Sequence, residues 1–388
     1  MSRALALVIL GLLVPLAHGL VPGLRVRAPS LQKMGFVPLQ GGCGVHQQLQ
    51  QVGGPLSAVA GMSVPNEDQR RKALNLMKRW ATGLSLGALC TLWIFCGNGV
   101  FTLVFLLVSL VAQSEYYAMV QNTHSILPTK KIGMVSLIMS YATAAMYPQF
   151  HEAVMPLSAS FLMLWLLIFN KKSALTSEIS TSLLGMFYIG YMPSFWVRLK
   201  TDAALAAVVP TFIPDALRAV PWLGASEWGL GSILTWWTWT SIVFADVGAY
   251  FIGKRFGRHK LNEVSLAAGA ASPNKTVEGA LGGFASCMVF AVLGALLMRW
   301  PFPLFSGAAY GLLTALIALV GDLTASMMKR DAGMKDSGNL LPGHGGLLDR
   351  IDSYMFTAPA SFYFCTCFLP YLARTASRKL ALALVAPL

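Results

Sequence analysis

Ionisable side chains are concentrated between residues 321 and 352 of this chain, which is apolar over most of its length. Only 12% of the 388 residues are charged, yet five of the 16 acidic residues lie in this short segment. They are Asp322, Asp331, Asp336, Asp349 and Asp352. An ionisable group inside a membrane costs several kcal/mol unless it is paired, hydrated or bound to an ion. The clustering therefore predicts a binding or catalytic site.

The first half of this segment fits the end of an apolar helix. Asp322, Ser326 and Lys329 are spaced i, i+4 and i+7, so on a helix they form one polar stripe. Arg330 follows directly. The stripe would therefore end in two cations, at the point where a glycine-rich loop begins.

The second half contains that loop, residues 331–346, and then a new apolar helix that starts near Leu347. Asp349 and Asp352 lie i, i+3 on one face of the new helix. If the two helices meet at their shared end, Asp322 converges with this pair. Mg²⁺ prefers carboxylate oxygens together with substrate phosphates. We therefore predict that the three aspartates bind Mg²⁺, and whether a second cation binds is left open.

Groups suited to binding phosphate surround these carboxylates. Four basic side chains could neutralise phosphate oxygens, namely Lys329, Arg330, Lys335 and Arg350. Gly345 and Gly346 would let backbone N–H groups approach an anion, and Asp336 and His344 are expected to contact substrate. The set is typical of phosphoryl or nucleotidyl transfer, in which positioning and charge stabilisation supply most of the catalysis. The alternative, a charged loop between two spans, leaves two aspartates inside apolar runs unexplained.

A second polar segment lies upstream and is expected to complete the site. Asp246 ends an apolar run, and we place it in the wall of the site. Ser272, Lys275 and Thr276 precede a predicted helix, whose N-terminus could bind a phosphate with help from the lysine. Glu278 falls in the first turn of that helix, where the helix dipole favours an acid whatever its role. Capping and a part in the site both remain open for Glu278.

Long apolar runs must position these residues. Hydrophobic residues make up 55% of the chain, and eight to ten runs approach or reach the roughly 17 to 25 residues that cross a bilayer. The eight clearest runs are 80–96, 132–146, 154–169, 179–197, 230–244, 281–298, 305–320 and 351–372. They lack the alternation of barrel strands, so we predict an all-α polytopic membrane protein with a polar cavity in its C-terminal half. Glu115, beside a shorter apolar run, is expected either to form structural hydrogen bonds or to join the site.

The N-terminal residues read as targeting segments. Residues 1–19 have the basic start, apolar stretch and small-residue cleavage site of a signal peptide. Residues 20–66 contain no Asp or Glu and resemble a transit peptide. Together they favour a bipartite leader for a plastid membrane, with a secretory signal and the endoplasmic reticulum as the alternative. The remainder divides into N-terminal membrane helices, 67–228, and catalytic membrane helices, 229–388.

The net charge of +13 favours contact with anionic lipid headgroups and a polyanionic substrate. The basic residues are scattered in short loops without an aromatic-lined stripe, so we expect no nucleic-acid partner. The sequence leaves the oligomeric state open, with a homodimer as one possibility.

The two polar segments together resemble the CDP-diacylglycerol synthases, or phosphatidate cytidylyltransferases. The family signature, S-x-x-K-R-x4-K-D-x5-P-G-H-G-G-x-x-D-R-x-D, is filled from Ser326 to Asp352. An upstream block, S-P-x-K-T-x-E-G, occupies residues 272–279, and a D-x-x-A-Y block occupies 246–250. One departure is Asn274, where the family often has a lysine.

This resemblance implies that CTP and phosphatidate react to give CDP-diacylglycerol and pyrophosphate within an intramembrane polar cavity. It also implies that Asp322 and Asp349 bind the metal, with Asp352 in support. Two other functions remain as alternatives. One is a CTP-dependent kinase acting on a polyprenol or on diacylglycerol, and the other is an ion or phosphate transporter.

Overall fold

The computed structural model describes residues 83, 85, 87–124, 128–169, 176–213, 228–338 and 345–376. The predicted leader, 1–66, and His344 lie outside the described residues. The chain divides into two compact units, Met1–Ala88 and Leu89–Leu388, and the second unit contains both polar segments. The leader and the division at residue 229 stay predictions.

The regular elements described in this unit are all helices, which confirms the all-α prediction. The α-helices are α3 (Asn98–His124), α4 (Lys130–Met146), α5 (His151–Phe169), α6 (Thr176–Leu184), α7 (Met192–Thr201), α8 (Ala203–Ala206), α10 (Leu230–Phe256), α11 (Leu266–Ala271), α12 (Val277–Leu297), α13 (Pro303–Asp331) and α14 (Leu348–Tyr363). Short 3-10 helices, η1 (Pro148–Phe150) and η4 (Leu261–Glu263), and π-helices, η2 (Gly185–Tyr191) and η5 (Phe364–Phe368), join or extend them. Within the described ranges there is no β-strand, only an isolated bridge between Lys260 and Thr276.

Several helices are long and apolar enough to cross a membrane. Four segments meet this criterion by length and composition: Asn98–Thr123, Pro148–Phe169, Val277–Leu297 and Pro303–Asp331. Other predicted runs are also helical. For example, α10 has 27 residues, which corresponds to a helix about 40 Å long. The protein is therefore an integral membrane protein with several spans. The count of eight to ten spans stays a prediction.

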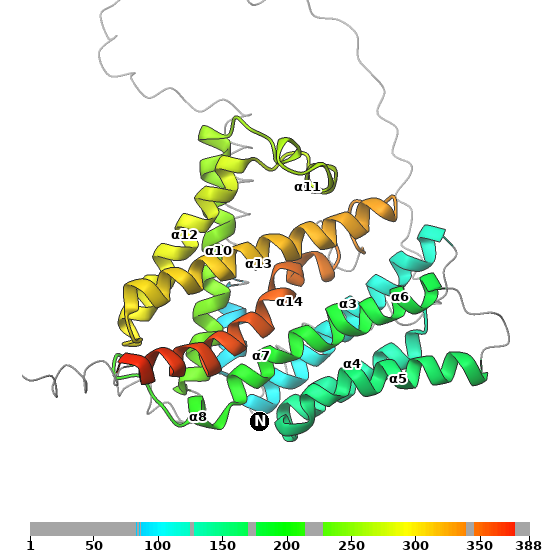
Figure 1. The fold of residues 1–388 in the computed structure, drawn as a ribbon, viewed down its shortest axis with the longest axis horizontal. Helices are drawn as coiled ribbons and strands as arrows, with labels where there is room; N and C mark the ends of the chain where they lie inside the picture. The colour runs from blue at the N-terminus through cyan, green and yellow to red at the C-terminus, as the bar shows by residue number, and fades with distance from the viewer. Residues whose placement is uncertain are drawn as a thin grey trace, which may run out of the picture. The chain divides into compact units, whose positions relative to one another are not determined.

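Three long helices, α10, α12 and α13, build the framework of the C-terminal half (Figure 1). Small residues let α10 and α12 approach closely, as is usual between helices in membranes. A Cβ atom placed on Gly283 would lie 2.8 Å from the Ala245 carbonyl oxygen, and one on Gly279 would lie 3.0 Å from that of Ala249. Because α12 also packs on α13, residues at the start of α12 and in the middle of α13 come together.

The helices α3 and α7 pack beside α14, and α4 packs on α3 and α7 (Figure 1). Buried aromatic rings mediate this contact. Trp196 on α7 lies edge-on to Trp239 on α10, with ring centroids 5.8 Å apart. Its indole N–H donates a hydrogen bond of 2.9 Å to the carbonyl oxygen of Tyr354 on α14. The N-terminal helices therefore hold α14 in place against the framework.

The backbones of α13 and α14 meet at Gly321. A Cβ atom on this residue would lie 2.6 Å from the carbonyl oxygen of Asp352, closer than real Cβ atoms approach an oxygen. Only glycine lets the two backbones come this near. The next residue on α13 is Asp322, so the same contact brings two of the predicted ligands to one level of the helix pair.

We predict that Gly321→Ala forces α13 and α14 apart. The expected destabilisation is about 1–3 kcal/mol, as for other overpacked sites, and it lowers the thermal unfolding midpoint of the protein in detergent. Gly99→Ala is the matched control, because a Cβ atom at Gly99 on α3 would meet nothing within 4 Å beyond its own stretch of helix. Equal midpoints for the two variants would contradict the close contact.

Candidate active site

A polar cavity of about 450 Å³ lies among α10, α12 and α13. Its polar lining comes from both segments that the sequence singled out: Asp246, Tyr250, Lys254, Asn274, Lys275, Thr276 and Asp322. The hairpin of α10 and α12 supplies all but one of these side chains, and α13 supplies Asp322. Two stretches more than 40 residues apart thus share one cavity, as the sequence predicts.

The central interaction in the cavity is an ion pair between Lys275 and Asp322. Both side chains keep about a third of their surface exposed, at 34% and 30%. The hydroxyl of Ser326, one turn further along α13, lies 3.4 Å from Oδ1 of Asp322 and donates to it. Asp322 and Ser326 of the predicted stripe therefore lie on one face of α13. A substrate that enters the cavity can therefore reach both partners of the pair.

The start of α12 is capped from within its own sequence. The Thr276 side chain accepts a hydrogen bond of 3.1 Å from the backbone N–H of Gly279. The Glu278 carboxylate accepts from the backbone N–H groups of Arg258 and His259, at 3.1 and 3.2 Å, and contacts Nδ1 of His259 at 2.6 Å. Glu278 therefore holds the connection between α10 and α12 and is absent from the cavity lining.

A second ion pair joins α13 to α14. Lys329 donates to Oδ1 of Asp349 at 2.6 Å, and both side chains are nearly buried, at 12% and 11% exposed. The other oxygen, Oδ2, accepts from the N–H and hydroxyl of Ser337, at 2.9 and 3.2 Å, and from the N–H of Gly346, at 3.1 Å. Asp349 thus binds the end of one helix, the following loop and the start of the next helix.

Among the predicted metal ligands, Asp352 feels the charges of the other two. Asp246 and Asp352 each lie near enough to Asp322 for their charges to repel it, and Asp352 also feels the charge of Asp349. Asp352 is buried, and its Oδ1 accepts from the backbone N–H of Ser353 at 2.7 Å. In the part of the chain that the structure describes, no three His, Cys, Asp or Glu side chains are already arranged to hold one metal ion.

The other predicted residues lie around the loop. Arg330, Lys335, Asp336 and Arg350 are exposed. Gly345 has a φ of 78°, and a Cβ atom there would lie 3.1 Å from Oδ2 of Asp349 and 3.3 Å from Oδ1 of Asp336, so it sits between these two carboxylates.

Ser272 ends α11 and accepts the N–H of Lys275 at 3.3 Å through its carbonyl oxygen. It is absent from the cavity lining, and a direct substrate contact for Ser272 stays a prediction. His344 falls outside the described residues, so its role also stays a prediction.

Comparison with known proteins identifies the family to which this site belongs. A sequence model of the cytidylyltransferase family matches residues 77–368, which include every helix of the cavity. The chain belongs to the cytidylyltransferase family. It is therefore a nucleotidyltransferase, and the resemblance drawn from the signature residues is confirmed.

Named relatives of this cytidylyltransferase come from bacteria and a plant. Phosphatidate cytidylyltransferase of Synechocystis sp. is 41% identical over 277 residues, which cover 71% of this chain and 92% of the relative. Phosphatidate cytidylyltransferase 4, chloroplastic, of Arabidopsis thaliana is 33% identical over 305 residues, 77% of this chain and 75% of the relative. The Bacillus subtilis phosphatidate cytidylyltransferase is 42% identical over 124 residues, 32% of this chain and 44% of the relative.

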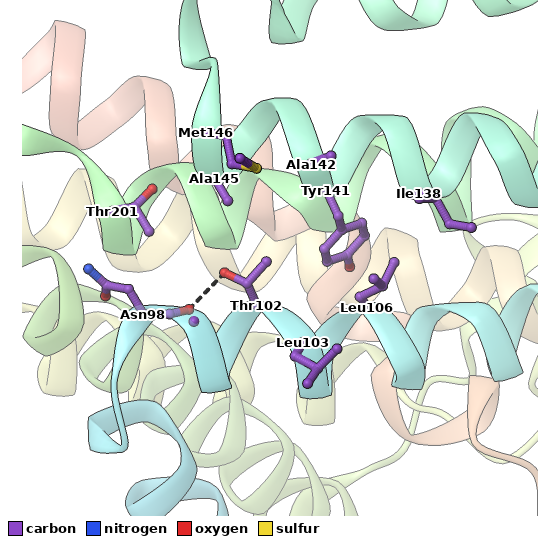
Figure 2. Close-up of a pocket in the computed structure, with 11 residues that line it drawn as sticks. Asn98, Thr102, Leu103, Leu106, Ile138, Tyr141, Ala142, Ala145, Met146 and Thr201 are labelled. Atoms are coloured by element: carbon purple, nitrogen blue, oxygen red, sulfur yellow. Dashed lines mark hydrogen bonds between the residues drawn. The ribbon is translucent and has the colours of Figure 1, made fainter.

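A second cavity in this cytidylyltransferase, of about 480 Å³, lies between α3 and α4 near the end of α7. Figure 2 shows Leu103, Leu106 and Ile138 along it, with Asn98 and Thr201 at one end. Its lining contains no Asp, Glu, Lys, Arg or His. An anionic nucleotide would find no compensating charge there, so the polar cavity is the candidate active site.

The structure connects Glu115 to the site, although the sequence did not decide its role. Glu115 on α3 accepts from the backbone N–H groups of Leu347 and Leu348, at 3.0 and 2.9 Å. It also accepts from the Ser337 hydroxyl at 3.0 Å. The only signal in the sequence was an acid beside an apolar run, which does not identify its partners more than 200 residues away.

The exposed contact between His259 and Glu278 predicts a pH effect. The hydrogen bond to Glu278 raises the pKa of His259 above its ordinary value of 6.5, and the nearby Glu263 adds to this. Because the raised pKa belongs to the folded state, the stabilising contribution is complete below about pH 6.5. It is lost as the pH rises through the raised pKa.

In Glu278→Gln, the pKa of His259 should fall back toward 6.5. The measurement is an NMR titration of protein with ¹³C-labelled histidine, in which His259→Gln assigns the signal. Glu263→Gln is the control and should shift the pKa of His259 less. An unchanged His259 titration in Glu278→Gln would show that the contact does not set this pKa.

Proposed function

We propose that this protein transfers the cytidylyl group of CTP to phosphatidate, giving CDP-diacylglycerol and pyrophosphate. The observation that carries the proposal is the polar cavity, in which Asp246, Lys275 and Asp322 from the two polar segments line one space. Its volume of about 450 Å³ falls in the range of small-molecule sites. The relatives that cover most of this chain are named phosphatidate cytidylyltransferases, which supports the same substrates.

The reaction requires charge compensation more than acid–base chemistry. An oxygen of the phosphatidate phosphate attacks the α-phosphorus of CTP in line. The bond from that phosphorus to the oxygen that bridges to the β-phosphate breaks, and pyrophosphate leaves with the electron pair. The attacking oxygen is already ionised, so no general base is needed. Lys275 in the cavity is placed to offset phosphate charge, and Lys329, Arg330, Lys335 and Arg350 supply further cations near the loop.

We also propose Mg²⁺ as the cofactor. The donors fit this ion, because Asp246 and Asp352 each lie near enough to Asp322 for their charges to repel it, and Mg²⁺ is commonly held by one or two carboxylates and substrate phosphates. Asp322 and Asp352 are the proposed ligands. Bound Mg²⁺ would neutralise and orient the phosphates of CTP.

Asp349 is less available for a metal ion. Four donors already occupy its two oxygens in the described arrangement. A metal role for Asp349, which the sequence also predicts, would require it to release at least one of these donors.

We further propose a plastid membrane as the location. Two relatives in Arabidopsis thaliana carry the word chloroplastic in their names, which supports the plastid over the endoplasmic reticulum. A homodimer stays a prediction.

The position of the label in the lipid product tests the proposed reaction. Purified protein incubated with phosphatidate, Mg²⁺ and CTP labelled at the α-phosphate should produce labelled lipid. CTP labelled at the γ-phosphate should leave the lipid unlabelled. With diacylglycerol or a polyprenol in place of phosphatidate, a CTP-dependent lipid kinase would give the reverse pattern. A transporter would label no lipid at all, and either result would refute the proposal.

Loss of the Asp322 carboxylate should abolish most of the activity. Asp322→Asn keeps the size of the side chain but removes its charge, and we expect kcat/KM to fall by about 100-fold or more. Chelation of divalent cations should stop the wild-type reaction, and added Mg²⁺ should restore it. Asp331→Asn, an exposed acid at the end of the same helix, is the control and should stay near wild type. Wild-type activity in Asp322→Asn would remove this residue from the mechanism.

A further inference from the structure

We propose that Glu115 is a positioning residue of the active site. It holds the start of α14 and the preceding loop, so that Asp349 and Lys329 remain paired at the end of α13. The inference rests on the proposed function in one respect, namely that the Asp349–Lys329 pair belongs to the active site of the proposed reaction. The contacts themselves are independent of it.

Glu115 supplies the cap that the sequence of α14 lacks. The first N–H groups of any helix have no acceptor within the helix, and an acid near them is also favoured by the helix dipole. The residue before α14 is Leu347, which makes no side-chain cap. The Glu115 carboxylate instead accepts from Leu347 through Oε1, at 3.0 Å, and from Leu348 through Oε2, at 2.9 Å. A residue of α3 therefore completes a helix that begins more than 200 residues later.

The same carboxylate is linked to Asp349 through Ser337. The hydroxyl of this buried serine lies 3.0 Å from Oε2 of Glu115 and 3.2 Å from Oδ2 of Asp349, so both carboxylates share it. The backbone N–H of Ser337 donates to Asp349, and Asp349 binds Lys329. A continuous chain of polar contacts thus runs from α3 to the end of α13.

The loop is packed tightly around Glu115. A Cβ atom on Gly338 would lie 2.8 Å from Oε1 of Glu115, and one on Gly346 would lie 2.6 Å from Oε2. Both residues belong to the segment between α13 and α14, so the carboxylate lies against the two described ends of this loop. A shorter side chain at this position would leave the N–H groups of Leu347 and Leu348 without their acceptor, and the Ser337 hydroxyl with Asp349 alone.

Other contacts would keep the helices in place without Glu115. The Gly321 backbone still meets Asp352, and Trp196 still donates to the Tyr354 carbonyl oxygen. The effect of removing Glu115 should therefore be local to the loop and to the Asp349–Lys329 pair. A purely structural residue would instead destabilise the whole helix bundle.

The test combines hydrogen exchange with kinetics in the full-length protein. In Glu115→Ala, amide exchange should accelerate at Ser337, Gly346, Leu347 and Leu348, and stay at the wild-type rate in α10 and α12. We expect kcat to fall by about 10- to 100-fold, as when residues that orient a functional carboxylate are removed, with the KM for CTP changed by less than about threefold. Glu115→Gln keeps the volume and one acceptor oxygen, so it should give intermediate values for both readouts.

Glu152→Gln is the matched control, because Glu152 on α5 also accepts two side-chain hydrogen bonds, from Arg198 and Tyr363. It should leave both readouts at wild type. Wild-type exchange at Leu347 and Leu348 in Glu115→Ala, or faster exchange spread over all helices with an unchanged kcat, would overturn the positioning role.

If Glu115→Ala fails to fold, Glu115→Gln decides by the same criteria. A wild-type protein without cytidylyl transfer would refute the proposed function, while the exchange data would still judge Glu115.

Discussion

A carboxylate inside an apolar helix bundle must find a compensating donor, and this constraint organises the site. Asp322 is paired with Lys275, Asp349 with Lys329, and Glu115 with two N–H groups at the start of α14. Each pairing joins two different elements. These contacts therefore compensate charge and join neighbouring elements at the same time.

The two ion pairs differ in exposure, and this difference fits two different roles. Lys275 and Asp322 are about one third exposed and line the cavity, whereas Lys329 and Asp349 are about one tenth exposed. An accessible pair can exchange its partner for a phosphate or a cation when substrate enters. A nearly buried pair with further hydrogen bonds from the loop is better suited to holding the loop in shape.

Helix packing makes these pairings possible. The glycines of α12 let it approach α10, and Gly321 lets α13 approach α14. The N-terminal helices contribute through Trp196, which holds α14, and through Glu115, which holds its first turn. The half of the chain that carries no signature motif is thus part of how the site is built.

The sequence by itself determined the class of fold and the family, and it singled out four residues that line the cavity, Asp246, Lys275, Thr276 and Asp322. Apolar runs specify membrane helices because lipid leaves no other way to satisfy the backbone, and the spacing of Asp322 and Ser326 gives one face of a helix by geometry alone. The tertiary structure decided which donor each carboxylate meets. Asp349 is bound by Lys329 and the loop, and Glu115 caps α14, because these contacts depend on how distant helices pack, which local spacing does not specify.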